Sequence, residues 1–408
     1  MTRTSALARA CVAVVVVLLL TAARLEAGSV TLAWDPNPEP EVTGYLLLYG
    51  TQPGVYTAQI DVGNHTQYSV LGIAGGTYYF TVEAYTADGT ISAPAAEVTA
   101  IVRNLPATLA PDFDGDARTD LVVRRSSDNT WYVAKSGSSY ATYKAIVFGN
   151  SAAGDMPLSA DMDGDGVADV VTFRPSTGQW SWLKSTTGFD PAQAGSVSWG
   201  IPGDVPMLAD MDGDGKADIV IWRPSSGWWV WLKSSLNLNT SQYGAVQFGV
   251  SALGDKPMLA DMDGDGKADI IVWRASQQAW WYWLKSSVNF DPSQYGALAF
   301  GSGSTEDVPL TGDFDGDGKA DPTIWRPGPG MYWVVLSSSG FNASFSRQLG
   351  GRGDRPLLGD FDGDGQADLA VWRASNGTWY WLTSGAGWTG GFARPWGAPT
   401  LGDVPVVK

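Results

Sequence analysis

Hydrophobic and polar residues alternate with a period of two in the first hundred residues, and this pattern predicts short β-strands. The alternating segments are separated by turn sequences such as Asp35-Pro36-Asn37-Pro38 and Asp88-Gly89. They cover residues 29–34, 43–50, 66–73, 77–85 and 96–102. Residues 28–102 are therefore predicted to fold as a β-sandwich, and residues 103–107 as a short linker that Pro106 stiffens.

From residue 108 the pattern changes to a repeat of strand, acidic loop, strand, turn, strand, strand. The loop has the form D-x-D-x-D-G-x-x-D and begins at residues 112, 161, 210, 261, 313 and 360, a period of about 49. Four short strands per repeat of this length are typical of one antiparallel propeller blade. We expect an all-β protein in which residues 108–408 form six four-stranded blades.

Seven blades is the alternative number, because residues 403–407 resemble another first strand. That segment either closes the ring beside the first blade or begins a further blade.

The acidic loop has the spacing of a site for a hard cation. Carboxylates at positions 1, 3, 5 and 9 and a backbone carbonyl at position 7 supply an all-oxygen shell, which Ca²⁺ accepts in loose geometry. Glycines at positions 4 and 6 allow the positive φ angles of so tight a turn. We expect about six Ca²⁺ ions. The predicted ligands are Asp112, Asp114, Asp116, Arg118 and Asp120; Asp161, Asp163, Asp165, Val167 and Asp169; Asp210, Asp212, Asp214, Lys216 and Asp218; Asp261, Asp263, Asp265, Lys267 and Asp269; Asp313, Asp315, Asp317, Lys319 and Asp321; Asp360, Asp362, Asp364, Gln366 and Asp368.

Two other interpretations of the loop are weaker. An EF-hand needs a Glu at position 12 and flanking helices, whereas position 12 here is Thr172, Ile221 or Val272 in apolar, β-branched runs. The second interpretation is a set of polar turns that bind no metal. It is weaker because four carboxylates in each loop would repel one another with no cation to neutralise them. The first loop is expected to be the weakest site, because Ala117 replaces a glycine and Arg118 adds a cation to the loop.

The acidic loops, their period and the pairs Phe148-Gly149, Phe248-Gly249 and Phe300-Gly301 resemble the FG-GAP (VCBS-type) repeats of integrin α-chains and bacterial secreted proteins. The resemblance covers residues 105–408 and implies a β-propeller with calcium between the first two strands of each blade. It implies no particular ligand.

The preceding sandwich resembles a fibronectin type III domain. Trp34 lies where that family has a core tryptophan, and the run from Tyr78 to Ala84, with Leu71 before it, resembles its tyrosine corner. We interpret Trp34 and Tyr78 as core residues.

The amino terminus resembles a secretory signal peptide. Residues 1–27 combine Arg3 and Arg9 with an apolar run and the sequence Leu25-Glu26-Ala27. Cleavage after Ala27 would remove Cys11, the only cysteine, and leave no disulfide. The run is short for a membrane span, although an uncleaved anchor is the alternative. We therefore predict a secreted or cell-surface protein without a membrane span, most simply a monomer.

The net charge of −16 comes largely from the metal loops and argues against a nucleic-acid partner, which would need a basic face. Catalytic groups are scarce. The chain has one histidine, and Glu306 is the only glutamate after residue 102, so a Ser-His-Asp triad or a paired-carboxylate hydrolase is hard to assemble.

Three further columns recur in all six repeats. They are an arginine (Arg125, Arg174, Arg223, Arg274, Arg326, Arg373), a tryptophan (Trp131, Trp180, Trp229, Trp281, Trp333, Trp379) and an aspartate (Asp155, Asp204, Asp255, Asp307, Asp354, Asp403). We expect the tryptophans to pack between blades, with sugar-stacking platforms as the alternative. We expect Arg–Asp ion pairs that link adjacent blades, with an arginine ring for anionic ligands as the alternative.

Tryptophans outside the column, namely Trp199, Trp228, Trp280, Trp388 and Trp396, are the candidates for exposed contacts. Arg352-Gly353-Asp354 spells an integrin-recognised tripeptide but belongs to the repeated frame. The predicted function is a secreted calcium-binding module for an extracellular glycan or protein ligand. A polysaccharide lyase or hydrolase and a ligand-free spacer are the alternatives.

Overall fold

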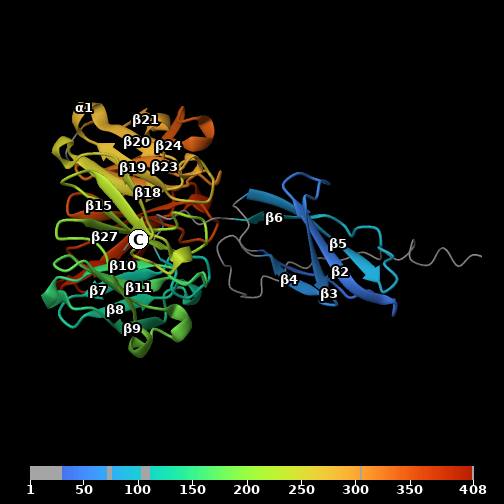
Figure 1. The fold of residues 1–408 in the computed structure, drawn as a ribbon. Helices are drawn as coiled ribbons and strands as arrows, with labels where there is room; N and C mark the ends of the chain where they lie inside the picture. The colour runs from blue at the N-terminus through green and yellow to red at the C-terminus, as the bar shows by residue number, and fades with distance from the viewer. Residues whose placement is uncertain (1–29, 71–75, 103–110, 304–305, 407–408) are drawn as a thin grey trace, which may run out of the picture. The chain divides into compact units, whose positions relative to one another are not determined.

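The structure is a computed structural model that describes residues 30–70, 76–102, 111–303 and 306–406 (Figure 1). It divides into two compact units, Met1–Asn104 and Leu105–Lys408. The predicted signal segment 1–27 and linker 103–107 lie outside the described residues. In the described ranges, no helix has the length and apolar character needed to cross a membrane.

The first unit consists of two antiparallel sheets. One has the order β1–β4 and the other β3–β2–β5–β6. The strands are β1 Val30–Ala33, β2 Val42–Gly50, β3 Ala58–Gly63, β4 Gln67–Val70, β5 Gly76–Thr86 and β6 Val98–Val102. Five of these six were expected from the alternation. Strand β3 was missed, because its sequence AQIDVG carries few strongly apolar residues.

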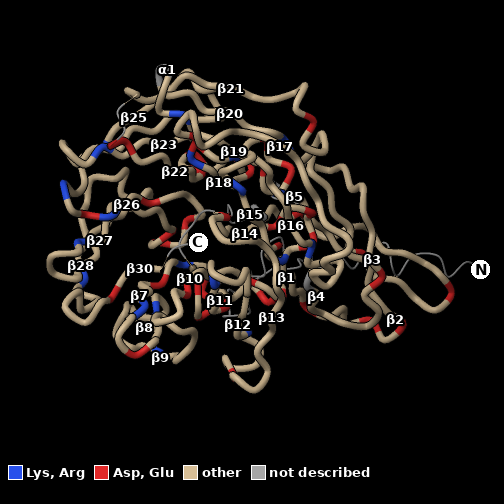
Figure 2. Tube along the Cα trace, turned by 60° about the vertical axis from the view of Figure 1, so that its left-hand side comes forward, with Lys and Arg blue, Asp and Glu red and all other residues tan. Residues whose placement is uncertain are grey.

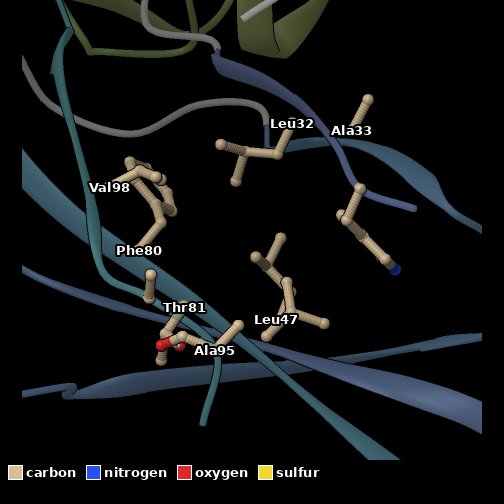
Figure 3. Close-up of a pocket in the computed structure, with 10 residues that line it drawn as sticks. Leu32, Ala33, Leu47, Phe80, Thr81, Ala95 and Val98 are labelled. Carbon is tan, nitrogen blue, oxygen red and sulfur yellow. Dashed lines mark hydrogen bonds between the residues drawn. The ribbon is translucent and has the colours of Figure 1, made fainter. Parts of the chain in front are cut away.

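The core of the first unit lies between the two sheets. Trp34 and Tyr45 meet edge to face with ring centroids 5.7 Å apart, and Leu47 and Phe80 are fully buried beside them. Trp34 is a core residue as predicted, and Tyr78 is partly buried against the same cluster. The apolar cavity in Figure 3 lies among these side chains and has a volume of about 10 Å³. Such a cavity is near the minimum for one water molecule, so it holds no organic ligand.

The second unit contains six four-stranded antiparallel sheets in its described part, the repeated arrangement of a β-propeller. We number them sheets 1 to 6. Sheet 1 is β30 (Asp403–Pro405), β7 (Leu121–Arg125), β8 (Thr130–Ala134) and β9 (Tyr143–Val147); sheet 2 is β10 (Met156–Ala160), β11 (Asp169–Arg174), β12 (Gln179–Leu183) and β13 (Gly195–Ser198); sheet 3 is β14 (Val205–Ala209), β15 (Asp218–Arg223), β16 (Trp228–Leu232) and β17 (Tyr243–Gln247); sheet 4 is β18 (Asp255–Ala260), β19 (Asp269–Arg274), β20 (Trp280–Leu284) and β21 (Gly296–Ala299); sheet 5 is β22 (Val308–Gly312), β23 (Asp321–Arg326), β24 (Met331–Leu336) and β25 (Ala343–Gln348); sheet 6 is β26 (Asp354–Gly359), β27 (Asp368–Arg373), β28 (Thr378–Leu382) and β29 (Gly391–Pro395).

Helical structure in the second unit is limited to single turns. The α-helix α1 covers Ser276–Ala279, and the 3₁₀ turns are Ser136–Ser138, Ser151–Ala153, Ser185–Thr187, Pro191–Gln193, Ser234–Leu236, Ser251–Leu253, Ser286–Val288, Pro292–Gln294, Ser337–Ser339, Ser384–Ala386 and Pro399–Leu401.

The six sheets surround a common centre. Figure 2 shows β10, β14, β18, β22, β26 and β30 innermost, with β9, β13, β17, β21 and β25 at the periphery. A separate buried cluster of apolar side chains lies between each pair of neighbouring sheets, including the pair formed by sheets 6 and 1. Each sheet is therefore packed on both faces.

Sheet 1 is completed by the far end of the chain. β30 pairs with β7 in the register Asp403↔Arg125, and Val406 donates its backbone N–H to the carbonyl of Val122 at 2.9 Å. The Arg125 guanidinium binds both carboxylate oxygens of Asp403, with Nε 2.7 Å from Oδ1. The segment 403–406 therefore supplies the innermost strand of the first sheet.

The predicted tryptophan column is buried in five sheets. Trp131, Trp180, Trp229, Trp281 and Trp379 have no exposed surface. In sheet 5 the prediction is wrong. Tyr332 takes the buried position and pairs with Trp325, whereas Trp333 points to the opposite face, under the guanidinium of Arg326. Tyr332 pairs with the residue before the column arginine, as Trp180 pairs with Phe173, so strand register sets the position.

The Arg and Asp columns form bidentate ion pairs, but each pair lies within one sheet. Asp204 immediately precedes β14 and Arg223 ends β15, with Nε 2.8 Å from Oδ1 and Nη2 2.9 Å from Oδ2. The expectation that these pairs link adjacent blades is wrong, because antiparallel pairing returns the end of the second strand to the start of the first. The other pairs are Arg125–Asp403, Arg174–Asp155, Arg274–Asp255, Arg326–Asp307 and Arg373–Asp354.

Removal of one arginine from this column should destabilise the second unit. The Asp204 side chain is 1% exposed, so Arg223→Ala leaves a buried carboxylate without its cation and should cost about 3 kcal/mol. Arg223→Lys should recover only part of this loss, since an ammonium group cannot reproduce the two parallel bonds. Chemical denaturation of both variants measures the change. An Arg223→Ala protein as stable as the parent would show that the arginines serve a surface role instead.

Candidate metal centres

The six acidic loops each precede the second strand of a sheet and share one conformation; in sheets 2 to 6 they connect it to the first strand. In the second loop the position-1 carboxylate, Asp161, accepts N–H bonds from Gly164 and Gly166 at 2.6 and 2.7 Å. Both glycines have positive φ, 82° and 78°. The position-9 carboxylate, Asp169, accepts the N–H of Met162 and so closes the loop. Figure 2 shows acidic residues recurring from sheet to sheet in the second unit.

This conformation gathers carboxylate oxygens from different loop positions. Groups of three lie within 4.8 Å of one another, and they combine positions 1, 3 and 9 in four loops and positions 1, 3 and 5 in Asp261–Asp265. The groups are Asp112, Asp114 and Asp120; Asp161, Asp163 and Asp169; Asp210, Asp212 and Asp218; Asp261, Asp263 and Asp265; Asp313, Asp315 and Asp321. These clusters could each hold a metal ion. The carbonyls expected at position 7 remain a prediction.

The position-3 aspartates show that hydrogen bonds within the protein do not satisfy the clusters. Oδ1 of Asp163, Asp212, Asp263 and Asp362 is buried and has no hydrogen-bond partner in the described part of the chain. A buried carboxylate oxygen without a donor is costly. A cation bound between positions 1, 3 and 9 would satisfy this oxygen, so the donor set fits a hard divalent ion.

The raised pKa values of the position-9 aspartates also indicate that the loops suit a cation. Burial, reinforced by the neighbouring carboxylates, raises the pKa of Asp169 to about 7 and that of Asp120 to about 8. Burial also raises the pKa of Asp218, Asp269, Asp321 and Asp368 to about 7. Without a cation, these carboxylates would therefore be partly protonated near neutral pH.

A serine column supports the loops and was missed in the sequence analysis. In sheet 2, Ser185 donates its backbone N–H to Oδ1 of Asp169 at 2.6 Å and its hydroxyl to Oδ2 of Asp165 at 2.7 Å. The equivalent serines in the other sheets are Ser136, Ser234, Ser286, Ser337 and Ser384. Each follows the position-9 aspartate by 16 or 17 residues, so this column of serines could have been found from the sequence repeat.

The residue after this serine divides the loops into two kinds. Thr186, Ser235, Ser287 and Ser338 donate a hydroxyl to the position-3 aspartate in loops 2 to 5. In loops 1 and 6 the residue is Gly137 or Gly385, which donates only its backbone N–H. A Cβ at Gly385 would lie 2.8 Å from Asp362 Oδ2, so a side chain does not fit there.

Ala117 adopts the glycine-like conformation that the sequence predicted, with φ of 65°. The Arg118 side chain does not stay within loop 1 but extends to the neighbouring loop, while its backbone carbonyl remains a predicted ligand. A Cβ on Gly363 in loop 6 would lie 3.0 Å from Arg118 Nε. In the other loops, too, the position-7 side chain reaches the preceding loop. Lys216 of loop 3, for example, packs over Gly164 of loop 2.

Comparison with known proteins identifies the repeat. The profile of the FG-GAP-like repeat matches residues 112–172, 161–221, 210–272 and 261–321, which together span just over half of the chain. The chain belongs to the FG-GAP-like repeat family. The match ends at loop 5, and the structure places a sixth FG-GAP-like loop of the same conformation at residues 360–368.

The individual proteins that resemble this chain are only distantly similar to it. A Kelch domain-containing protein of Saccharolobus solfataricus is 38% identical over 92 residues, 22% of this chain and 12% of that protein. An Agrocybe aegerita lectin structure, described for recognition of non-reducing terminal N-acetylglucosamine, aligns with TM-score 0.44 and 14% identity over 69% of this chain and 91% of the lectin. The extracellular domain of a putative one-component system from Bacteroides thetaiotaomicron aligns with TM-score 0.35 and 11% identity, over 78% of this chain and 41% of that one.

Partly exposed aromatic rings form rows on the outer strands of the FG-GAP-like sheets. On sheet 4, Trp280 stacks on Tyr282 at 5.8 Å, Tyr295 follows at 6.2 Å, and the Arg274 guanidinium lies 5.3 Å from the Tyr282 ring. Tyr295 is 55% exposed. A second row combines Tyr132, Tyr143 and Trp396, and a pair joins Trp199 to Tyr243.

The predicted exposed tryptophans fall into different environments. Trp228 is exposed and Trp280 is partly exposed, as predicted. Trp199 and Trp396 occupy the aromatic position of the aromatic-Gly pair, so they do belong to a repeated column. Trp388 differs from the prediction, because it stacks on Phe345 at 4.6 Å.

The tripeptide Arg352-Gly353-Asp354 is not displayed as a recognition loop. Arg352 binds Glu306, and the Asp354 carboxylate is held by Arg373.

The first loop should be strengthened by Ala117→Gly. A non-glycine residue at positive φ costs on the order of 1 kcal/mol, and glycine removes that cost. We expect tighter calcium binding at loop 1, measured by loop-resolved hydrogen exchange during a calcium titration. Gly215→Ala in loop 3 is the matched control and should weaken that loop. Unchanged or weaker binding at loop 1 in Ala117→Gly would contradict the conformational argument.

Stability without metal should fall as the pH rises from about 4 to 7. The position-9 aspartates have a folded-state pKa raised to about 7, above their ordinary value of 3.8. Their contribution to stability is therefore complete below pH 3.8 and is lost as the pH rises through 7. In excess calcium the slope should reverse, because the metal binds the ionised carboxylates. Melting curves of the second unit in chelator and in calcium test this, and parallel pH profiles would refute it.

Proposed function

We propose that this protein is a secreted binding module in which a calcium-loaded, six-bladed propeller presents aromatic blade edges to extracellular carbohydrate. The interpretation of six blades is supported by the six sheets and by the apolar cluster that joins sheet 6 to sheet 1. Under this proposal residues 1–27 direct export, and a fibronectin type III-like domain precedes the propeller. The strand order β3–β2–β5–β6 of the larger sheet is compatible with that domain type.

Calcium is the metal that best suits the loops. All side-chain donors are carboxylates, none of the 30 predicted ligand positions is His or Cys, and the loops are open enough for several oxygens. The ligands would be the aspartates at positions 1, 3, 5 and 9 with the position-7 carbonyl. Bound calcium would neutralise the loops and fix the turn between first and second strands. With no cysteine in the described residues, these ions would replace disulfides as cross-links.

The observation that carries the ligand proposal is the row Trp280–Tyr282–Tyr295. Three rings lie in sequence on and beside the outer strands of one sheet, and the outermost is more than half exposed. Arg274 is also bound to Asp255, so its guanidinium is fixed beside the rings. An aromatic surface bordered by fixed polar groups suits a sugar ring, whose faces present C–H groups and whose edges present hydroxyls. The ligand class is therefore a glycan, and an acidic chain would be repelled by the charge of −16.

The proposed role requires no catalytic group. The only histidine, His65, is exposed in the first unit, and Glu306 is held by Arg352. We also propose that the protein acts as a monomer, with no nucleic-acid partner.

A glycan-array screen in calcium and in chelator tests the proposal. We expect binding to neutral glycans in calcium, loss of binding in chelator, and no turnover. Trp280→Ala should reduce affinity about tenfold or more, since central aromatic contacts dominate such interfaces. Trp228→Ala is the matched control. It removes an exposed tryptophan that makes no contact with another aromatic ring in the described residues, so it should have little effect.

Each other outcome has a defined meaning. Cleavage of a bound polysaccharide would identify a lyase or hydrolase. Absence of binding to glycans and matrix proteins in both conditions would identify a spacer. Equal losses in Trp280→Ala and Trp228→Ala would refute the sheet 4 row as the site.

A further inference from the structure

The six metal loops are bonded to one another in a closed ring. In each loop the N–H of position 8 donates to the position-1 carbonyl of the preceding loop, at 2.6 to 2.8 Å. The bonds run from Ala168 to Asp112, Ala217 to Asp161, Ala268 to Asp210, Ala320 to Asp261, Ala367 to Asp313, and Thr119 to Asp360. The last bond joins loop 1 to loop 6, so every loop has two bonded neighbours.

These bonds connect residues that would contact the metal. The acceptor is the backbone of the position-1 aspartate, whose carboxylate faces the candidate site in its own loop. The donor precedes the position-9 aspartate, a ligand of the next site. The donors are buried, with Ala320 and Ala367 fully so, and a hydrogen bond shielded from water resists local opening. Movement of one loop therefore displaces a ligand of the next.

Side chains reinforce the same connection. The position-7 residue of each loop lies over the position-4 glycine of the preceding loop, so that a Cβ on Gly213 would be 3.0 Å from Lys267 Cε. The equivalent contacts are Val167 on Gly115, Lys216 on Gly164, Lys319 on Gly264, Gln366 on Gly316 and Arg118 on Gly363.

We propose that the six loops bind metal as a coupled ring, in which occupancy of one loop raises the affinity of the two loops bonded to it. This inference rests on the proposed calcium function. An ion in loop 3 fixes the backbone of Asp210, and through Ala268 it orders the position-9 end of loop 4 before that loop binds its own ion. The second binding event then loses less conformational entropy. Through the N–H of Ala217, the same ion steadies the carbonyl of Asp161 in loop 2.

The junction between loops 6 and 1 has an additional bond. Thr119 stands where the other loops have alanine, and its hydroxyl accepts the N–H of Asp360 at 2.8 Å. This bond offers a way to weaken one link in the ring without changing a proposed ligand.

The test is loop-resolved hydrogen exchange of the full chain during a calcium titration. Asp212→Asn removes a ligand charge from loop 3 only. The calcium midpoints of loops 2 and 4 should rise at least about fivefold, the lower end of ordinary coupling between sites. Loop 6, three links away in either direction, should keep its midpoint. Asp190→Asn is the control for the same chemical change at an exposed turn, and it should leave all six loops unchanged.

Thr119→Ala provides a second test that does not depend on a ligand substitution. It should raise the midpoints of loops 6 and 1 and leave loops 3 and 4 unchanged. If six ions bind and neither variant affects neighbouring loops, the coupling is refuted while the calcium function stands. If native mass spectrometry of the parent protein shows no calcium bound, the calcium function itself is refuted, and the inference falls with it.

Discussion

The structure is governed by the cost of burying carboxylates that its repeats hold together away from water. A rise in pKa from 3.8 to about 7, as at Asp169, corresponds to an unfavourable ionisation free energy on the order of 4 kcal/mol. One such group in each of six loops would exceed the 5–15 kcal/mol by which domains are ordinarily stable. The fold therefore depends on protons or cations to neutralise the loops. The remaining features of the second unit place these loops in register.

The register comes from packing of the sheets rather than from the loops. Buried aromatic rings such as Trp180 and Trp229 fill the space between neighbouring sheets, and their indole N–H groups bind the carbonyl of an aromatic-Gly pair. The bidentate Arg–Asp pair then fixes the first strand of each sheet to the second. Apolar burial sets how the sheets face each other, whereas charge pairs and hydrogen bonds set their alignment along the strands.

Features that recur at fixed spacing could be predicted from the sequence. The repeat predicted the acidic loops and the positive φ at Ala117. It also predicted burial correctly for five of the six tryptophans in the column. The assignment failed for Trp333, because residue type was followed where strand register decides which side chain faces the core. The ion pairs were recognised but placed between blades, since strand pairing, which returns Arg223 to Asp204, is not visible in composition.

Other features required coordinates. The serine column recurs visibly, yet serine is common in turns, so nothing marked Ser185 as a partner of Asp165 until the third strand was placed beside the loop. The bonds between loops, and the reach of Arg118 into loop 6, join residues about one repeat or more apart. Such contacts depend on the angle between adjacent sheets, and local sequence does not encode that angle.

The first sheet also departs from the others in its core. Arg124 occupies the position that Phe173 or a tryptophan takes elsewhere, it is buried, and its Nε has no partner in the described residues. Burial lowers the pKa of this arginine. The interface between sheets 1 and 2 is thus less apolar than its five counterparts.

The completion of sheet 1 by residues 403–406 has a consequence for biosynthesis. A chain emerging from the ribosome can fold sheets 2 to 6 as each is released, because their strands are contiguous. Sheet 1 must wait, with the edge of β7 open, until almost three hundred further residues have followed. The ring of sheets can therefore close only after residues 403–406 have been translated. A chain interrupted earlier would expose the unpaired edge of β7 to proteases and chaperones.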